Sequence, residues 1–144
     1  MGSATYSGNV MGDVAYNPGS GWTTYTATGK MEMDWNFGSR TGELRINNFD
    51  RSVTPGGLNF AGPMCAPGNL GCGTPSGNHF GGPLNTRNAP ENLASIQGSA
   101  TGSFVNDGPN KAAGAIGNWN VSNGPEGNYK ATGIFAGRRG PGPN

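Results

Sequence analysis

The chain has 144 residues, nine Lys and Arg against eight Asp and Glu, and a formal net charge of +1. This length suits one domain, and the near-neutral charge argues against nucleic acid or an anionic membrane as the partner, since both attract basic surfaces. Glycine and proline are abundant, at 28 and 11 residues, but aromatic residues make up 9%. A folded β protein with many tight turns therefore explains the composition better than disorder does.

Apolar and polar residues alternate with period two along most of the chain, and no window shows a helical period. Turn residues such as Asn, Gly and Pro separate the alternating runs. The pattern predicts eight strands, at residues 4–16, 23–37, 41–50, 56–61, 78–85, 93–106, 111–122 and 128–138.

The second and third predicted strands form a hairpin with one apolar and one charged face. Met31, Met33 and Trp35 alternate with charged residues, and a turn follows at residues 39–42. Residues 47–48 then shift the phase by one, which predicts a β-bulge before the end of the third strand.

Several inward-facing sets combine small residues with large aromatic ones, as in Gly102 before Phe104 and Gly117 before Trp119. A narrow closed barrel needs this mixture, because glycine relieves crowding in sharply bent strands and rings fill the remaining interior. The expected fold class is all-β, an eight-stranded antiparallel up-and-down β-barrel.

The outward-facing residues, such as Lys30, Glu32 and Asp34, are polar, so the apolar band of a membrane-spanning barrel is missing and we expect a soluble barrel. No apolar stretch is long enough for a membrane helix, and the start of the chain shows no signal-peptide pattern. We expect a linker or cloning remnant at residues 1–3, the barrel at 4–139 and a flexible tail at 140–144.

Two cysteines, Cys65 and Cys72, lie in the longest irregular stretch, a predicted loop at residues 62–77. They are too few for a structural zinc site and lack the spacing of a redox motif. A disulfide closing this short loop would contribute roughly 2.5 kcal/mol. We favour that disulfide over two free thiols, and hence an oxidising, extracytoplasmic compartment. An exported domain without an export signal suggests a piece of a larger precursor.

Four segments carry a more specific pattern, at residues 5–12, 98–104, 113–119 and 129–139. They resemble, in that order, the opening strand, the "G-x-x-x-G-x-F" strand, the next strand and the closing strand of the transferrin-binding-protein-like β-barrel domain of bacterial surface lipoproteins. Residues 35–50 are similar to the version at the C-termini of large envelope proteins with an N-terminal FecR-type domain.

This resemblance implies an eight-stranded barrel displayed outside a bacterial cell, associated with the outer membrane or the periplasm. Some members of the family bind host proteins such as transferrin, through loops and a partner domain. The lipobox cysteine and the accompanying handle domain of those lipoproteins are not in the present sequence, so the resemblance leaves a role in iron acquisition open.

No residue pattern predicts catalysis, a metal site or a cofactor. His79 is the one histidine, so a Ser-His-Asp or Cys-His catalytic arrangement would have to include it. We favour the interpretation that His79 is a hydrogen-bonding residue of a strand or loop. Glu32 and Asp34 share one strand face like a glycosidase carboxylate pair, but Lys30 and Arg45 are expected to pair with them across strands.

The predicted function is a non-catalytic extracytoplasmic surface domain, which binds an unknown protein or glycan or serves as a rigid C-terminal module of a larger envelope protein. The alternative is a lipocalin-like carrier of a small ligand, and the filling of the lumen discriminates the two. The possible binding surface comprises the loop and the start of the strand after it, with Met64, Leu70, His79 and Phe80. It also includes an aromatic platform for a sugar or peptide at the first hairpin, formed by Trp22 with Tyr16 and Tyr25. A loop that only caps the barrel, and a Trp22 that plugs its end, remain open.

Overall fold

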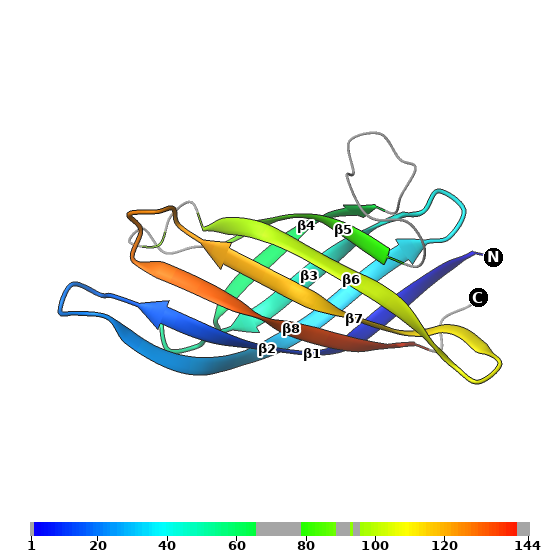
Figure 1. Cartoon of the computed structure of the whole chain (residues 1–144), viewed down its shortest axis with the longest axis horizontal. Helices are drawn as coiled ribbons and strands as arrows, with labels where there is room; N and C mark the ends of the chain where they lie inside the picture. The colour runs from blue at the N-terminus through cyan, green and yellow to red at the C-terminus, as the bar shows by residue number, and fades with distance from the viewer. Residues whose placement is uncertain (1, 66–78, 89–92, 94–95, 141–144) are drawn as a thin grey trace.

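The computed structural model describes residues 2–65, 79–88, 93 and 96–140. These residues form a closed barrel of eight antiparallel strands in chain order, with β8 pairing back onto β1, and helix is almost absent among them (Figure 1). The predicted fold class is confirmed. The strands are β1 (Ser3–Tyr16), β2 (Thr23–Asn36), β3 (Thr41–Phe49), β4 (Leu58–Cys65), β5 (His79–Thr86), β6 (Gln97–Asp107), β7 (Asn110–Ser122) and β8 (Tyr129–Arg139).

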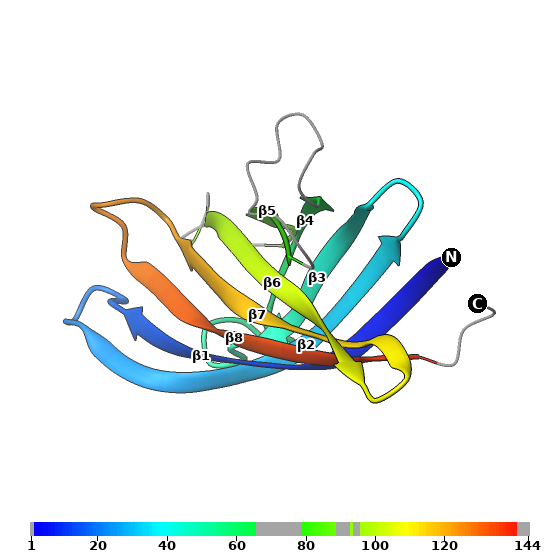
Figure 2. The same cartoon turned by 45° about the vertical axis from the view of Figure 1, so that its right-hand side comes forward.

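The strands differ in length, and this gives the two ends of the barrel different shapes. Strands β1 and β2 have 14 residues each, whereas β4 and β5 have eight. The β1–β2 hairpin therefore projects beyond its neighbours at one end, as the blue ribbon shows (Figure 2). Among the described residues, no helix is long and apolar enough to cross a membrane.

A β-bulge ends the pairing of β3, as the sequence predicts. The register of β3 against β4 shifts between Ile46 and Phe49. Asn48 and Asp50 both adopt left-handed backbone conformations with φ of 59°, which Asn and Asp tolerate better than most residues do. The bulge turns the chain away from β2 after only seven paired positions, from Lys30 to Asn36.

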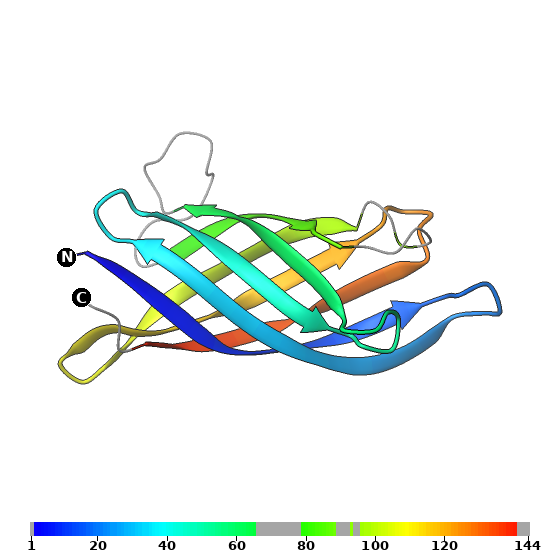
Figure 3. The same cartoon turned by 180° about the vertical axis from the view of Figure 1, so that it is seen from behind.

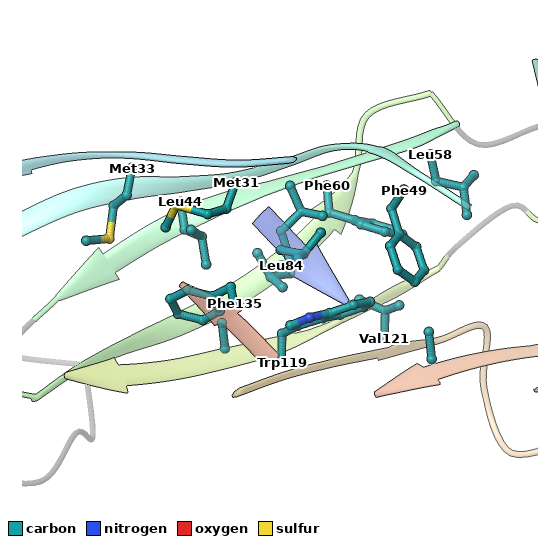
Figure 4. Close-up of a cluster of buried hydrophobic side chains, with 14 of the residues drawn as sticks. Met31, Met33, Leu44, Phe49, Leu58, Phe60, Leu84, Trp119, Val121 and Phe135 are labelled. Carbon is teal, nitrogen blue, oxygen red and sulfur yellow. The ribbon is translucent and has the colours of Figure 1, made fainter. Parts of the chain in front are cut away.

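Aromatic rings fill the middle of the lumen (Figure 4). Trp119 lies edge-on to Phe49, with ring centroids 4.7 Å apart, and 6.3 Å from Phe60. A second group joins Trp35 and Phe80, each 5.0–5.1 Å from Phe104. The predicted burial of Trp35 and Trp119 is confirmed, since they are 3% and 2% exposed.

Inward glycines make the space for these rings. A Cβ atom on Gly12 would lie 2.7 Å from Cζ2 of Trp119 and 3.1 Å from Cζ of Phe49. A Cβ atom on Gly117 would collide with Cζ of Phe135. The alternation of glycine with aromatic residues is thus a packing relation between strands, because each ring occupies the place where a side chain would stand on the adjacent strand (Phe135 on β8, Gly117 on β7) or on the strand after it (Trp119 on β7, Gly12 on β1).

The fourth strand and the loop after it differ from the prediction. Residues 62–65, expected at the start of the loop, belong to β4, and β6 begins at residue 97 instead of 93. Pro63 and Pro83 explain why the signal was weak, since proline donates no ladder hydrogen bond. The β4–β5 register skips the positions between Ala61 and Cys65, so this seam has little of the regular pattern on which the prediction depends.

A methyl group added at Gly12 tests the packing. We expect Gly12→Ala to lower the free energy of unfolding by about 1–3 kcal/mol, because overpacking displaces Trp119 or the strand. Urea denaturation followed by tryptophan fluorescence measures the change. Gly2→Ala is the control, since a Cβ atom there meets nothing within 4 Å. Equal midpoints for the two variants would contradict this packing.

Candidate binding surface

Three large apolar side chains stand exposed on the outer face of neighbouring strands. Met11, Ile116 and Ile134 are 52%, 48% and 59% exposed. Met11 on β1 is paired with Ile134 on β8, and Ile116 on β7 is paired with Ala136 on β8. The strand order thus brings these four residues together in one apolar stripe across β1, β8 and β7, which we call the outer ridge. Contiguous apolar surface of this kind marks interaction sites more often than scattered apolar residues do.

A hollow borders the outer ridge on each side. The first, here the β2 hollow, has a volume of about 890 Å³ and lies over β1, β2, β8 and the segment after β3. The second, the β6 hollow, has a volume of about 620 Å³ and lies over β5, β6, β7 and β8. Both are lined by Ile134, Phe135 and Ala136. One short piece of β8 therefore forms the shared wall of two recesses that open to solvent.

The β2 hollow combines apolar walls with cationic side chains. Met11, Ile134 and Ala136 contribute apolar surface, and Lys30 and Arg51 also line the hollow. The ammonium group of Lys30 donates a hydrogen bond to Oδ1 of Asn9, over 3.0 Å. A ligand here would meet an apolar wall beside positive charge, which favours an apolar group next to an anionic one.

The β6 hollow contains a histidine–serine pair. The Oγ atom of Ser103 lies 2.7 Å from Nδ1 of His79, and both residues line the hollow. A hydrolytic triad would need a carboxylate that orients the imidazole. Within the described residues, Ser103 is the one side chain that is hydrogen-bonded to His79. The pair can donate and accept hydrogen bonds from a ligand, which fits the predicted hydrogen-bonding histidine better than catalysis.

The residues predicted for the binding surface separate in the structure. His79 is exposed at the start of β5, whereas Met64 and Phe80 are 1% and 0% exposed and belong to the core. Their side chains cannot contact a partner, because β4 extends to Cys65 and the alternation of β5 turns Phe80 inward. The expectation that Met64 on the loop and the adjoining Phe80 offer contact surface is therefore wrong.

The cysteine loop lies mostly outside the described residues, and so do Leu70 and Cys72. Cys65 is the last residue of β4. The pairing of Cys65 with Cys72, and a contact surface on this loop, stay predictions.

The aromatic group predicted at the first hairpin does not form one platform. Trp22 is 52% exposed at the turn between β1 and β2. Tyr16 and Tyr25 pack instead against the core, and the ring of Tyr16 lies edge-on to Tyr129 at 5.8 Å. Trp22 therefore neither plugs the barrel nor stacks in a group, but remains available as a single exposed ring.

The structure holds a buried carboxylate that sequence reasoning missed. Asp50 is 2% exposed. Its Oδ2 atom accepts hydrogen bonds from the hydroxyls of Tyr25 and Tyr129, each over 2.7 Å, and its Oδ1 atom accepts one from the hydroxyl of Ser52. The left-handed conformation at Asp50 turns this side chain inward. These bonds tie the segment after β3 to β2 and β8 at the end of the barrel where the β1–β2 hairpin projects.

One arginine pairs with the acidic side chains on the charged face of β2. Arg45 on β3 contacts Glu32 at 2.7 Å, Asp34 at 3.0 Å and Glu43 at 2.8 Å. Partial burial by itself lowers the pKa of Arg45, but the three carboxylates raise it above its usual value. The expected cross-strand pairing of Arg45 is confirmed, and Glu32 and Asp34 belong to its ion-pair network. Lys30, expected to join them, forms no ion pair with any described residue and instead donates a hydrogen bond to Asn9.

Comparison with known proteins gives a likeness of fold alone. No family model matches the chain, and no curated protein matches it. Two mutant structures of the vaccine antigen transferrin binding protein B of Haemophilus parasuis Hp5 are similar, each with 18% identity and a TM-score of 0.63. Intact Ap-TbpB, with its N and C lobes, is similar at 16% identity and a TM-score of 0.62. The chain shares their barrel fold.

These solved proteins are much longer than the present chain. The alignments cover 96% of this chain but only 26%, 25% and 26% of the three solved chains. The expected resemblance to a transferrin-binding-protein-like eight-stranded barrel is confirmed for the fold, and the chain corresponds to about a quarter of such a protein.

Among the described residues, no group of three or more His, Cys, Asp or Glu residues is placed to hold a metal ion.

The tyrosine hydroxyls around Asp50 predict how stability depends on pH. Burial and the hydrogen bond to Asp50 raise the pKa of Tyr129 above its usual value, and burial is also the main cause that raises the pKa of Tyr25. In the unfolded chain, tyrosines ionise near pH 10. Above that pH the folded state keeps more protons than the unfolded state, so its stability falls as the pH rises.

Urea midpoints measured from about pH 9 to about pH 11 should therefore decrease. Tyr129→Phe removes one of the shifted groups, and its midpoint should fall less steeply over this range. Phenolate absorbance provides a direct check, since Tyr25 and Tyr129 should ionise only at higher pH than the tyrosines of the denatured chain. Identical titration curves for native and denatured protein would contradict the arrangement around Asp50.

Proposed function

We propose that this chain is a non-catalytic, extracytoplasmic binding domain that contacts a protein partner through the outer ridge and the hollows beside it. The observation that carries the proposal is the stripe of Met11, Ile116 and Ile134, three large apolar side chains left exposed on an outer face that is otherwise mostly polar. Burying such side chains against a partner contributes favourable free energy, at about 25 cal/mol per Å² of apolar surface.

A protein fits this surface better than a glycan does. The exposed side chains of the outer ridge are aliphatic, whereas recognition by stacking requires exposed aromatic rings. The recesses add polar groups beside the apolar stripe, including the Ser103–His79 pair and the cation of Arg51. An apolar centre with polar groups around it is the usual arrangement of a protein–protein interface.

The rigid scaffold also supports binding on the outside of the barrel. Rings of Trp119, Phe49 and Phe60 occupy the middle of the lumen, where a lipocalin-like carrier would hold its ligand. This filling favours surface recognition over the carrier function that we consider as the alternative.

The wider context is part of the same proposal. The barrel would be displayed on a bacterial surface, at the outer membrane or in the periplasm. It would be the C-terminal module of a larger envelope protein whose upstream part includes a FecR-type domain. The likeness in fold to transferrin binding protein B supports a binding role. The predicted Cys65–Cys72 disulfide would suit the same compartment. Transferrin itself is not proposed as the partner.

A charge placed on the outer ridge tests the proposal. Probed against an array of extracellular proteins, the wild-type domain should bind particular members. Ile134→Glu should weaken that binding at least tenfold, since it places a carboxylate where apolar surface becomes buried. Ser99→Glu is the matched control on an exposed polar position of β6, and it should bind as the wild type does.

Two outcomes would contradict the proposal. One is equal binding by Ile134→Glu and the wild type, which would place the contact elsewhere. The other is binding to members of a glycan array with none to the proteins, which would assign the surface to carbohydrate. Unfolding midpoints of both variants, measured alongside, separate a lost contact from a lost fold.

A further inference from the structure

The first half of β2 has a neighbouring strand on one side only. All 14 residues of β2 pair with β1, but only Lys30–Asn36 pair with β3. Beyond the bulge, the amide of Asp50 donates a hydrogen bond to the carbonyl of Thr28, over 3.3 Å. Residues 23–27 have no further strand beside them among the described residues, and Figure 3 shows β2 continuing past the end of β3 toward the projecting hairpin.

The free side of β2 presents backbone groups to solvent. In an antiparallel strand, the N–H and C=O of one residue point to the same side, and successive residues alternate. The carbonyl of Thr28 points toward Asp50, so those of Thr26 and Thr24 point the same way, with their N–H groups. Thr24 and Thr26 are exposed. Within the described chain, nothing pairs with these two donors and two acceptors, and such an edge is a template for another strand.

The same edge borders the β2 hollow, and the charge there selects among strands. Thr26 and Thr28 line the hollow together with Lys30 and Arg51. The carboxylate of Asp50 is already occupied by hydroxyl groups of Tyr25, Tyr129 and Ser52. Arg51 forms no ion pair with any described residue, so its guanidinium is available to an incoming carboxylate.

We propose that the edge of β2 at residues 23–28 binds an extended peptide strand of a partner protein that carries acidic side chains. The peptide would pair with the backbone of Thr24 and Thr26 and place a carboxylate beside Arg51 and Lys30, while its apolar side chains contact the β2 hollow. A second copy of this chain fits less well, because it would add its own Arg51 and Lys30 to the positive charge. This inference rests on the proposed function, since it names the kind of partner for one side of the outer ridge.

Two capped synthetic peptides of about six residues, the usual length of a strand, test the inference. Both peptides have a backbone of alternating valine and threonine in which two of the threonines are replaced. The replacements are glutamates in one peptide and lysines in the other. Fluorescence anisotropy should show at least tenfold tighter binding of the glutamate peptide to the wild-type domain. Arg51→Glu should reverse this preference, because the charge beside the strand is inverted.

Backbone pairing needs a separate variant. Thr26→Pro removes the N–H that points outward while leaving the pairing with β1 available, and it should abolish binding of the glutamate peptide. Thr26→Val keeps the N–H and should bind like the wild type. Circular dichroism of the proline variant confirms that the barrel is intact; if it unfolds, Thr24→Pro provides the same test.

Equal affinity for the two peptides, or full binding to an intact proline variant, would overturn the inference. Failure of this inference can be distinguished from failure of the proposed function. Protein binding that is sensitive to Ile134→Glu, without binding of either peptide, removes strand addition and leaves the outer ridge as the contact surface. Peptide binding without any effect of Ile134→Glu on array binding leaves the edge site and removes the ridge.

Discussion

The packing of aromatic rings against inward glycines is the constraint on which this barrel depends. Eight strands enclose a narrow interior, and Trp119 on β7 fits there because Gly12 on β1 has no side chain. Phe135 uses the space above Gly117 in the same way. The result is a lumen filled by rings, with the strands as a rigid wall around it. The proposed partner would then be recognised from outside, where the register of β1, β8 and β7 brings Met11, Ile134 and Ile116 together.

A single irregularity creates most of what is distinctive at one end of the barrel. The bulge after Ile46 ends the pairing of β3 with β2 and turns Asp50 inward. The buried carboxylate gathers the hydroxyls of Tyr25 and Tyr129, which links β2 to β8. The same early end of β3 leaves the first half of β2 unpaired on one side and forms a wall of the β2 hollow. The bulge therefore produces both the buried hydrogen bonds of Asp50 and the unpaired edge of β2.

The strands and the inward sets were predictable because period-two alternation records which side of a strand is buried. The bulge was predictable for the same reason, since it shifts that phase. The prediction was weakest at β4 and β5, where Pro63 and Pro83 interrupt the ladder, so Met64 and Phe80 were placed on the surface. The outer ridge could not be predicted from the sequence, because its members are single apolar residues on three strands and only the strand register makes them neighbours. Asp50 was missed because its burial depends on hydroxyls about 25 and 79 residues away.

The central claim is that the lumen is closed to ligands and that recognition takes place on the outer face. The most direct measurement follows the indole N–H resonance of Trp119 by NMR during titration with an apolar fluorescent fatty acid. This indole lies among the rings and donates a hydrogen bond to the carbonyl of Ile134, over 3.3 Å. The account predicts no shift of the Trp119 resonance, because a fatty acid that binds at the β2 hollow stays outside the lumen. Stoichiometric binding with a shift of the Trp119 signal would show that the lumen admits a ligand and would contradict the account.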